Sequence, residues 1–152
     1  MSYIILLFQN TALVSAALSW FIAQTIKTIL TLMQTKSFVP ERLFGSGGMP
    51  SAHSASVVAL MMSIQHTCGL DSPEFAIALC FASVVLYDAM GVRRAAGEQA
   101  KVINKMVDVM EKEGTDITEK DLKEHLGHTP MEVLCGILLG IVVSLVIESI
   151  NL

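Results

Sequence analysis

A glycine-rich turn that leads into a histidine is the first part of the sequence that could carry chemistry. Residues 46–54 read SGGMPSAHS. Glycines let backbone N–H groups approach a ligand closely, and Pro50 suits the first turn of a helix, whose free N–H groups favour an anion. We therefore predict that Gly48 and Ser51 bind phosphate and that His53 protonates a phosphoester oxygen. The alternative is a turn that only starts a helix, with His53 hydrogen-bonded in the core.

Two arginines, Arg93 and Arg94, follow an acid that lies within an apolar segment, Asp88. A buried carboxylate needs a partner, and either arginine could supply it, which makes Asp88 a structural residue behind the site. An arginine can also hold phosphate in a bidentate fork, so we predict both as phosphate-binding residues. The alternative is a signal for membrane topology, with contacts to lipid head groups.

A histidine and an acid, His128 and Glu132, flank Pro130. On a helix that starts near Pro130, Glu132 lies about one turn from His128, where a carboxylate can fix the imidazole tautomer and raise its basicity. This spacing predicts a catalytic pair in which Glu132 orients a nucleophilic His128. The alternative is an N-terminal helix cap with an acid near the positive end of the helix dipole.

Two lysines are further candidates for binding phosphate. Lys27 follows Gln24 by three residues, so both share a helix face, and its ammonium group either snorkels to the interface or pairs within a bundle. Lys36 is more simply a cytoplasmic topology charge, with a smaller chance of reaching phosphate. His66 has no evident partner and is interpreted as an ordinary surface or interface residue.

The composition predicts an integral membrane protein in which these residues lie at the ends of helices. The chain is 53% hydrophobic and 16% charged, against about 25% charge in an average soluble domain. Most charges fall in residues 27–42 and 93–128. The net charge of −4 gives no reason to expect a nucleic-acid partner, and we expect no metal ion or other cofactor.

The hydrophobic segments predict an all-α, polytopic membrane helix bundle that forms a single domain over residues 1–152. Spans of roughly 20 residues are needed to cross the bilayer, and the sequence offers about four, at about 3–32, 50–68, 73–91 and 131–150. We interpret the first as a retained span rather than a signal peptide.

The segment of about 98–128 is expected to be a soluble, helical loop. Its apolar residues recur at helical spacing and define one face: Val102, Ile103, Met106, Val109 and Met110. A stop at Gly114 and a capping box from Thr118 to Asp121 predict a second short helix. The first helix could pack over the site, lie on the membrane surface or form a homodimer contact.

Basic residues follow the predicted first and third spans, whereas the turn between the second and third carries no lysine or arginine. The positive-inside rule then places both loops in the cytoplasm, of a bacterial cytoplasmic membrane in our interpretation. All the polar motifs fall on this face. Two histidines, arginines and a helix N-terminus on one face together describe an oxyanion site for phosphoryl chemistry.

The motifs also resemble those of a known family. Residues 50–53, PSAH, are similar to the Pro-Ser-Gly-His motif of the type 2 phosphatidic acid phosphatase and vanadium-dependent haloperoxidase superfamily. Together with segments 46–55, 88–97 and 126–130, they resemble its divergent bacterial and plant membrane branch over essentially the full chain. Among the differences from the superfamily, a loop of about thirty residues separates Arg94 from His128, and the acid is Glu132 rather than aspartate.

The resemblance implies a metal-independent phosphoric ester hydrolase that works through a phosphohistidine. It gives His53 the role of general acid, His128 that of nucleophile and Glu132 that of orienting acid, with arginines on the phosphate. The expected substrate is a phospholipid or isoprenoid phosphate, either a monoester or a diphosphate. The alternatives are a non-catalytic protein that binds lipid phosphate or another anion, and a phosphatase for a soluble phosphorylated metabolite.

Overall fold

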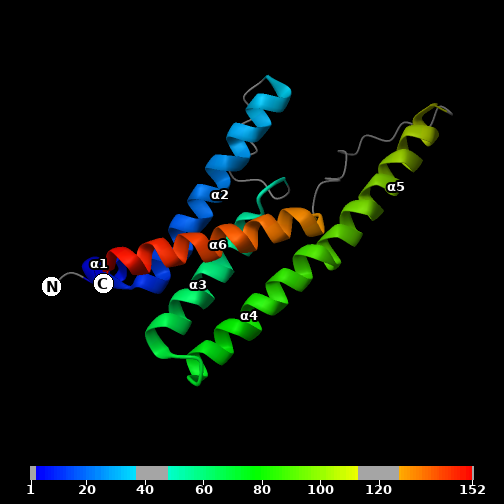
Figure 1. Cartoon of the computed structure of the whole chain (residues 1–152). Coiled ribbons are helices and arrows are strands. Elements are labelled where there is room, and N and C mark those ends of the chain that lie inside the picture. The colour runs from blue at the N-terminus through cyan, green and yellow to red at the C-terminus, as the bar shows by residue number, and fades with distance from the viewer. Residues whose placement is uncertain (1–2, 37–47, 113–126, 152) are drawn as a thin grey trace.

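The protein is a bundle of helices. The computed structural model describes residues 3–36, 48–112 and 127–151, and within these ranges it contains helices and no strands. The helices, shown in Figure 1, are α1 Tyr3–Gln9, α2 Thr11–Thr35, α3 Ala52–Cys68, α4 Pro73–Met90, α5 Val92–Lys112 and α6 Pro130–Asn151. The predicted all-α class is therefore confirmed.

Asn10 divides the first hydrophobic segment into two helices. Its side-chain Oδ1 accepts a hydrogen bond from the backbone N–H of Leu13 at 3.0 Å, which caps the start of α2. An asparagine stabilises a helix start in this way because it satisfies a backbone donor that the helix leaves open. The hydrophobic segment of about 3–32 therefore begins with α1 as a separate short helix, and the predicted bounds of the span stay a prediction.

The core lies where α2, α3 and α6 meet, and small residues line it. Ala23 of α2 packs against Ala52 and Ala55 of α3. A Cβ atom added to Gly140 of α6 would come within 2.5 Å of the carbonyl oxygen of Ala55. Small side chains let helix backbones approach closely, which is the usual way for helices to associate where lipid removes the hydrophobic driving force.

Within the described ranges, three helical stretches are long and apolar enough to cross a membrane: Thr11–Thr35, Pro73–Met110 and Pro130–Ile150. Large apolar side chains such as Phe21, Phe81 and Val142 are exposed on them, as expected for surfaces that face lipid. The integral membrane character is thus confirmed. α3 has 17 residues, or about 26 Å at 1.5 Å per residue. It packs between α2, α4 and α6, and its crossing of the whole bilayer stays a prediction.

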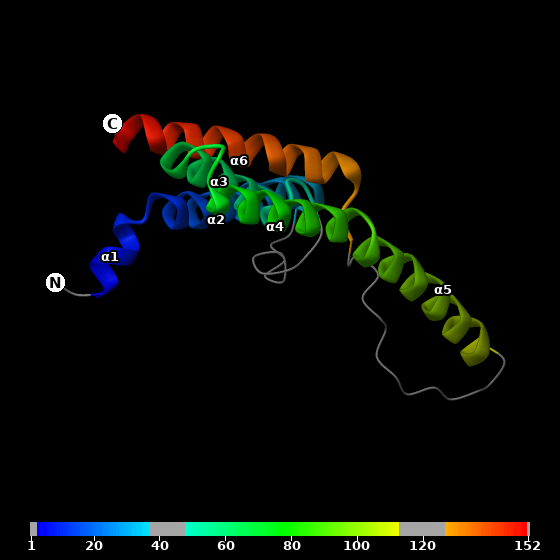
Figure 2. The same cartoon turned by 90° about the horizontal axis from the view of Figure 1, so that it is seen from below.

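α5 follows α4 with only Gly91 between them, so a helix already begins at Val92, before the predicted loop of about 98–128, whose bounds stay a prediction. Figure 2 shows α5 extending away from the layer formed by α2, α3, α4 and α6. Among the described helices it contacts only α4, and the predicted apolar face around Met106 is exposed. The expected stop at Gly114 and the capping box from Thr118 to Asp121 lie outside the described residues.

Candidate active site

Backbone hydrogen bonds join the starts of α3 and α6 to the end of α4. The N–H of Ser51, just before α3, donates to the carbonyl oxygen of Glu132 in α6 at 3.0 Å. The N–H of His128, just before α6, donates to the carbonyl oxygen of Ala89 in α4 at 3.1 Å. Three segments that are far apart in the sequence therefore meet at one end of the bundle, and each carries one of the predicted motifs.

A close backbone contact brings the arginine motif to the histidine motif. A Cβ atom on Gly127 would lie 2.2 Å from the Cα atom of Arg94 and 2.3 Å from its backbone nitrogen. Only glycine permits such an approach, because any larger residue would overlap the backbone of α5. Arg94 and His128 are far apart in the sequence, but their backbones lie close together in the fold, since Gly127 directly precedes His128.

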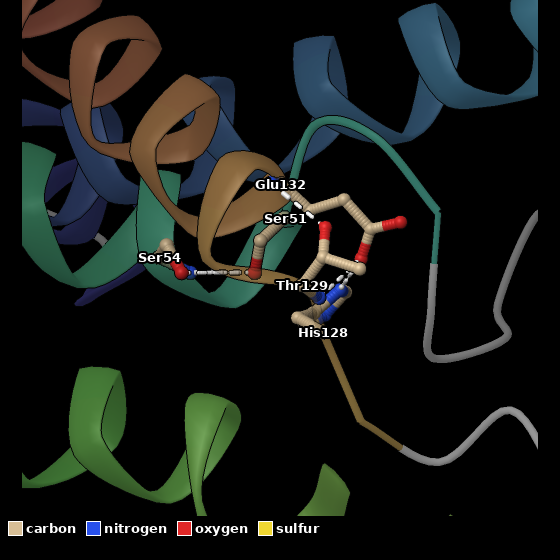
Figure 3. Close-up of polar contacts among 5 residues, drawn as sticks. All are labelled: Ser51, Ser54, His128, Thr129 and Glu132. Atoms are coloured by element: carbon tan, nitrogen blue, oxygen red, sulfur yellow. Dashed lines mark hydrogen bonds and ion pairs between the residues drawn. The ribbon is translucent and has the colours of Figure 1, made fainter.

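His128 and Glu132 form the pair that their spacing predicts. Nδ1 of the buried His128 ring lies 3.1 Å from Oε2 of Glu132, and Figure 3 shows the carboxylate turned toward the ring. An ionised carboxylate can only accept hydrogen bonds, so this contact places the ring proton on Nδ1. In the neutral ring Nε2 is then the unprotonated nitrogen, which is the form that a nucleophilic or basic histidine needs.

Glu132 also caps α6, so the two interpretations of this motif are compatible. Its Oε2 accepts from the N–H of Thr129 at 3.0 Å, and its own N–H donates to Oγ1 of Thr129 at 3.3 Å. Such a reciprocal pair is a capping box. The carboxylate is held in place by the start of the helix and in turn holds the imidazole of His128.

The glycine-rich turn ends in a second helix cap. Oγ of Ser51 accepts from the N–H of Ser54 at 3.4 Å and from its hydroxyl at 2.9 Å, and both residues are buried. A Cβ atom on Gly136 would lie 2.5 Å from the carbonyl oxygen of Ser51. The start of α3 is therefore pressed onto α6, and the positive ends of both helix dipoles lie at the same end of the bundle.

A pocket of about 150 Å³ opens between these elements. Among the described residues, its polar lining comes from His53, Asp88 and His128, and its apolar lining comes from α4 at Val84, Val85 and Ala89. The two histidines that were predicted to share a phosphate-sized space thus line the same pocket, together with the acid of the arginine motif. The side chain of His53 is exposed, whereas that of His128 is buried.

Lys27 lies inside the bundle rather than at its surface. Its side chain is 2% exposed, and its Cγ atom is 3.3 Å from the position that a Cβ atom on Gly48 would take. Gly48 has a φ of +85°, a conformation that favours glycine. Of the two alternatives for Lys27, burial in the bundle is the one observed, beside the turn that leads to His53.

Of the other predicted residues, Lys36 and Arg94 are not among the described residues that line the pocket. Lys36 is exposed at the end of α2, nine residues and therefore about 14 Å of helix beyond Lys27. The side chain of Arg94 is exposed as well. For Arg93 the structure describes the backbone, within the first turn of α5. The phosphate-binding roles of these three residues, and those of Gly48, Ser51 and Lys27, stay predictions.

Comparison with known proteins places the chain in a family. Residues 8–143 match the model of a family described as the divergent PAP2 family. The chain belongs to this divergent PAP2 family. It is also 40% identical over 151 residues to the protein named "Uncharacterized membrane protein YuiD" of Bacillus subtilis (strain 168), covering 93% of this chain and 96% of the relative. No solved structure matches it. The resemblance inferred from the motifs is confirmed.

Sequence reasoning missed two features of this molecule. The first is the part that Thr129 takes in the helix cap expected at this position, which the pattern of threonine followed three residues later by an acid could have indicated. The second is the pairing of His66, interpreted as an ordinary surface residue. Its Nδ1 lies 3.5 Å from Oε2 of Glu148 near the end of α6, a contact between distant segments for which the sequence gives no local signal.

Proposed function

We propose that the protein is a membrane phosphatase that hydrolyses a lipid phosphate monoester or diphosphate. The observation that carries the proposal is the pocket that His53 and His128 line together. Oε2 of Glu132 contacts Nδ1 of His128, which leaves Nε2 for the reaction. Membership of a family related to the type 2 phosphatidic acid phosphatases supports the same chemistry.

The proposed reaction has two steps. Nε2 of His128 attacks phosphorus while the bond from phosphorus to the lipid oxygen breaks, and His53 gives its proton to that leaving oxygen. Glu132 stabilises the positive charge that grows on the ring of His128. Water then attacks the phosphohistidine, His53 takes a proton from this water, and inorganic phosphate leaves with the starting protonation states restored.

Positive charge for the phosphate oxygens comes from three sources in this proposal. The N-termini of α3 and α6 both lie at the pocket end of the bundle, and a helix N-terminus attracts anions. Lys27 contributes a cation buried beside Gly48. Arg93 and Arg94 start α5 next to the loop of His128 and are proposed to close on phosphate when substrate binds. No step requires a metal ion.

The size and walls of the pocket favour a lipid head group over a whole small molecule. Its volume of about 150 Å³ is below the ~300–1,000 Å³ of typical small-molecule sites. Val84 and Val85 line it from α4, a helix that is apolar enough to cross the membrane. A phosphate group would fill the pocket while the attached chains remain in lipid alongside α4. The basic residues Lys36, Arg93 and Arg94 lie at the end of α2 and the start of α5. By the positive-inside rule they support a site on the cytoplasmic face.

The test is phosphate release by the purified, full-length protein in lipid–detergent micelles. Phosphatidate, phosphatidylglycerophosphate and a polyprenyl diphosphate represent the lipid classes, and soluble phosphate monoesters represent the metabolites. We expect release from at least one lipid and a loss of about 10²–10⁴-fold in His53→Ala, the usual contribution of a general acid. Release from soluble esters alone would contradict lipid specificity. Binding of lipid phosphate without release would favour the non-catalytic alternative.

A further inference from the structure

A second polar cluster lies at the end of the bundle away from the pocket. α3 and α6 both begin at the pocket and run in the same direction, so their last turns lie together at the opposite end. There the carboxyl group of Glu148, 8% exposed, lies 3.5 Å from the ring of His66 through Oε2. This carboxylate takes no part in the proposed phosphatase site.

Several buried polar atoms on α2, α3 and α6 lack a hydrogen-bond partner within the described part of the chain. Oε1 of Glu148 and the hydroxyl oxygens of Ser15, Ser19 and Ser63 are buried, and none has a hydrogen-bond partner within the described part of the chain. The three serines are 0% exposed. A polar group in such a position costs several kcal/mol in a membrane when nothing binds it.

The packing of α2, α3 and α6 places these residues at neighbouring levels along the helix axes. On α6, Gly140 packs against Ala59 of α3, and Glu148 contacts His66, so Ser144 between them lies near the level of Ser63. On α2, which runs in the opposite direction, Ala23 packs against Ala52 and Ala55. Ser19 and Ser15 lie one and two turns further along α2, toward the level of Ser63.

Close helix packing alone does not explain why the hydroxyl groups of these serines have no hydrogen-bond partner among the described residues. Serine and threonine in a helix commonly donate to the carbonyl oxygen four residues earlier, and Thr28, Thr67 and Ser83 of this protein do so at 2.8 Å. The hydroxyl groups of Ser15 and Ser63 make no such bond among the described residues. Their oxygens therefore remain available inside the α2–α3–α6 interface.

We propose that this cluster binds a small monovalent cation, such as sodium, between α2, α3 and α6. Carboxylate and hydroxyl oxygens are the ligands that hard cations prefer. The cluster has one carboxylate, Glu148, so a single positive charge neutralises it. A divalent ion would leave an excess positive charge buried between the helices. The hydroxyl of Ser144 donates to the carbonyl oxygen of Ile141 at 3.4 Å and keeps its lone pairs for the ion.

The cation would enter from the membrane face opposite the phosphatase pocket. His66 has a side chain that is 48% exposed and forms the outer edge of the cluster. Among the described residues of the three helices, it is the titratable group in contact with Glu148. By linking α2, α3 and α6 through one ion, the cluster would hold together the helices that position the active site.

Thermal unfolding of the full-length protein in detergent tests this proposal. At constant ionic strength, sodium chloride replaces choline chloride. We expect the Tm to rise by about 3–5 °C for each tenfold increase in sodium above its Kd, because a ligand of the folded state stabilises by mass action. Glu148→Gln should abolish the dependence on sodium, and Ser63→Ala should move its midpoint to higher concentration.

The matched control is Ser149→Ala, which removes an exposed hydroxyl from the residue after Glu148 and should keep the full sodium response. An equal rise in potassium chloride would support a site for monovalent cations in general. A Tm that does not differ between sodium and choline, or a response that survives in Glu148→Gln, would overturn the proposal. If Glu148→Gln does not fold, binding of radioactive sodium is measured on Ser15→Ala and Ser63→Ala instead. Weaker binding than to the wild type would support the proposal, and equal binding would overturn it. Neither readout depends on phosphatase activity.

Discussion

The bond between His128 and Glu132 gives the sharpest prediction about how the site works. Glu132→Gln keeps the size of the side chain but replaces a charged hydrogen bond, worth about 1.5–3 kcal/mol, with a neutral one, worth about 0.5–1.5 kcal/mol. The difference of about 1–2 kcal/mol acts on the positively charged ring in the transition state. We therefore expect kcat for phosphate release to fall about 5–30-fold, with a much smaller change in KM.

Thr129→Ala is the matched control, because it damages the same helix cap without touching the histidine contact. It removes the Oγ1 atom that accepts from the N–H of Glu132. The loss of a cap costs about 0.5–2 kcal/mol of stability, so this variant should lower Tm and leave kcat nearly unchanged. Phosphate release and thermal unfolding are measured on both variants. Equal losses of kcat in both, or full kcat in Glu132→Gln, would refute the orienting role of Glu132.

Three glycine substitutions give further predictions. Gly136→Ala should cost about 1–3 kcal/mol of stability because its Cβ atom would meet the carbonyl oxygen of Ser51 at 2.5 Å; activity should fall with Tm, and an unchanged Tm would contradict the packing. Gly48→Ala should cost about 1–2 kcal/mol for its φ of +85° and should raise KM if Lys27 binds phosphate, as kinetics with the lipid substrate will show. Gly127→Ala should lower kcat by moving His128 away from Arg94; a wild-type kcat would show that this contact does not position the site.

Local patterns were enough to predict the helical elements and the pairing within one turn. His128 and Glu132 are four residues apart, so the start of α6 alone brings them together. Helix ends were harder, because one polar side chain decides them. Asn10 starts a new helix inside an apolar run, and α5 begins directly after Gly91 although its first turn carries two arginines.

The assembly of the site depends on contacts that no local pattern encodes. The bond from Ser51 to Glu132 and the approach of Gly127 to Arg94 each join distant segments through backbone atoms. Backbone contacts leave little trace in the types of the residues, apart from the need for glycine. The same reason explains why His66 looked unpartnered, since Glu148 reaches it only through the packing of α3 against α6.

The most direct test of the account compares three histidine variants in one assay. Phosphate release from the preferred lipid is measured for His53→Ala, His128→Ala and His66→Ala, with base-stable labelling by radioactive phosphate to detect a phosphohistidine. His66 lies on the same helix as His53 but outside the pocket lining. We predict that the first two variants lose activity, that label on the wild type maps to His128, and that His66→Ala retains full activity. Normal release by His53→Ala and His128→Ala would contradict the proposed function.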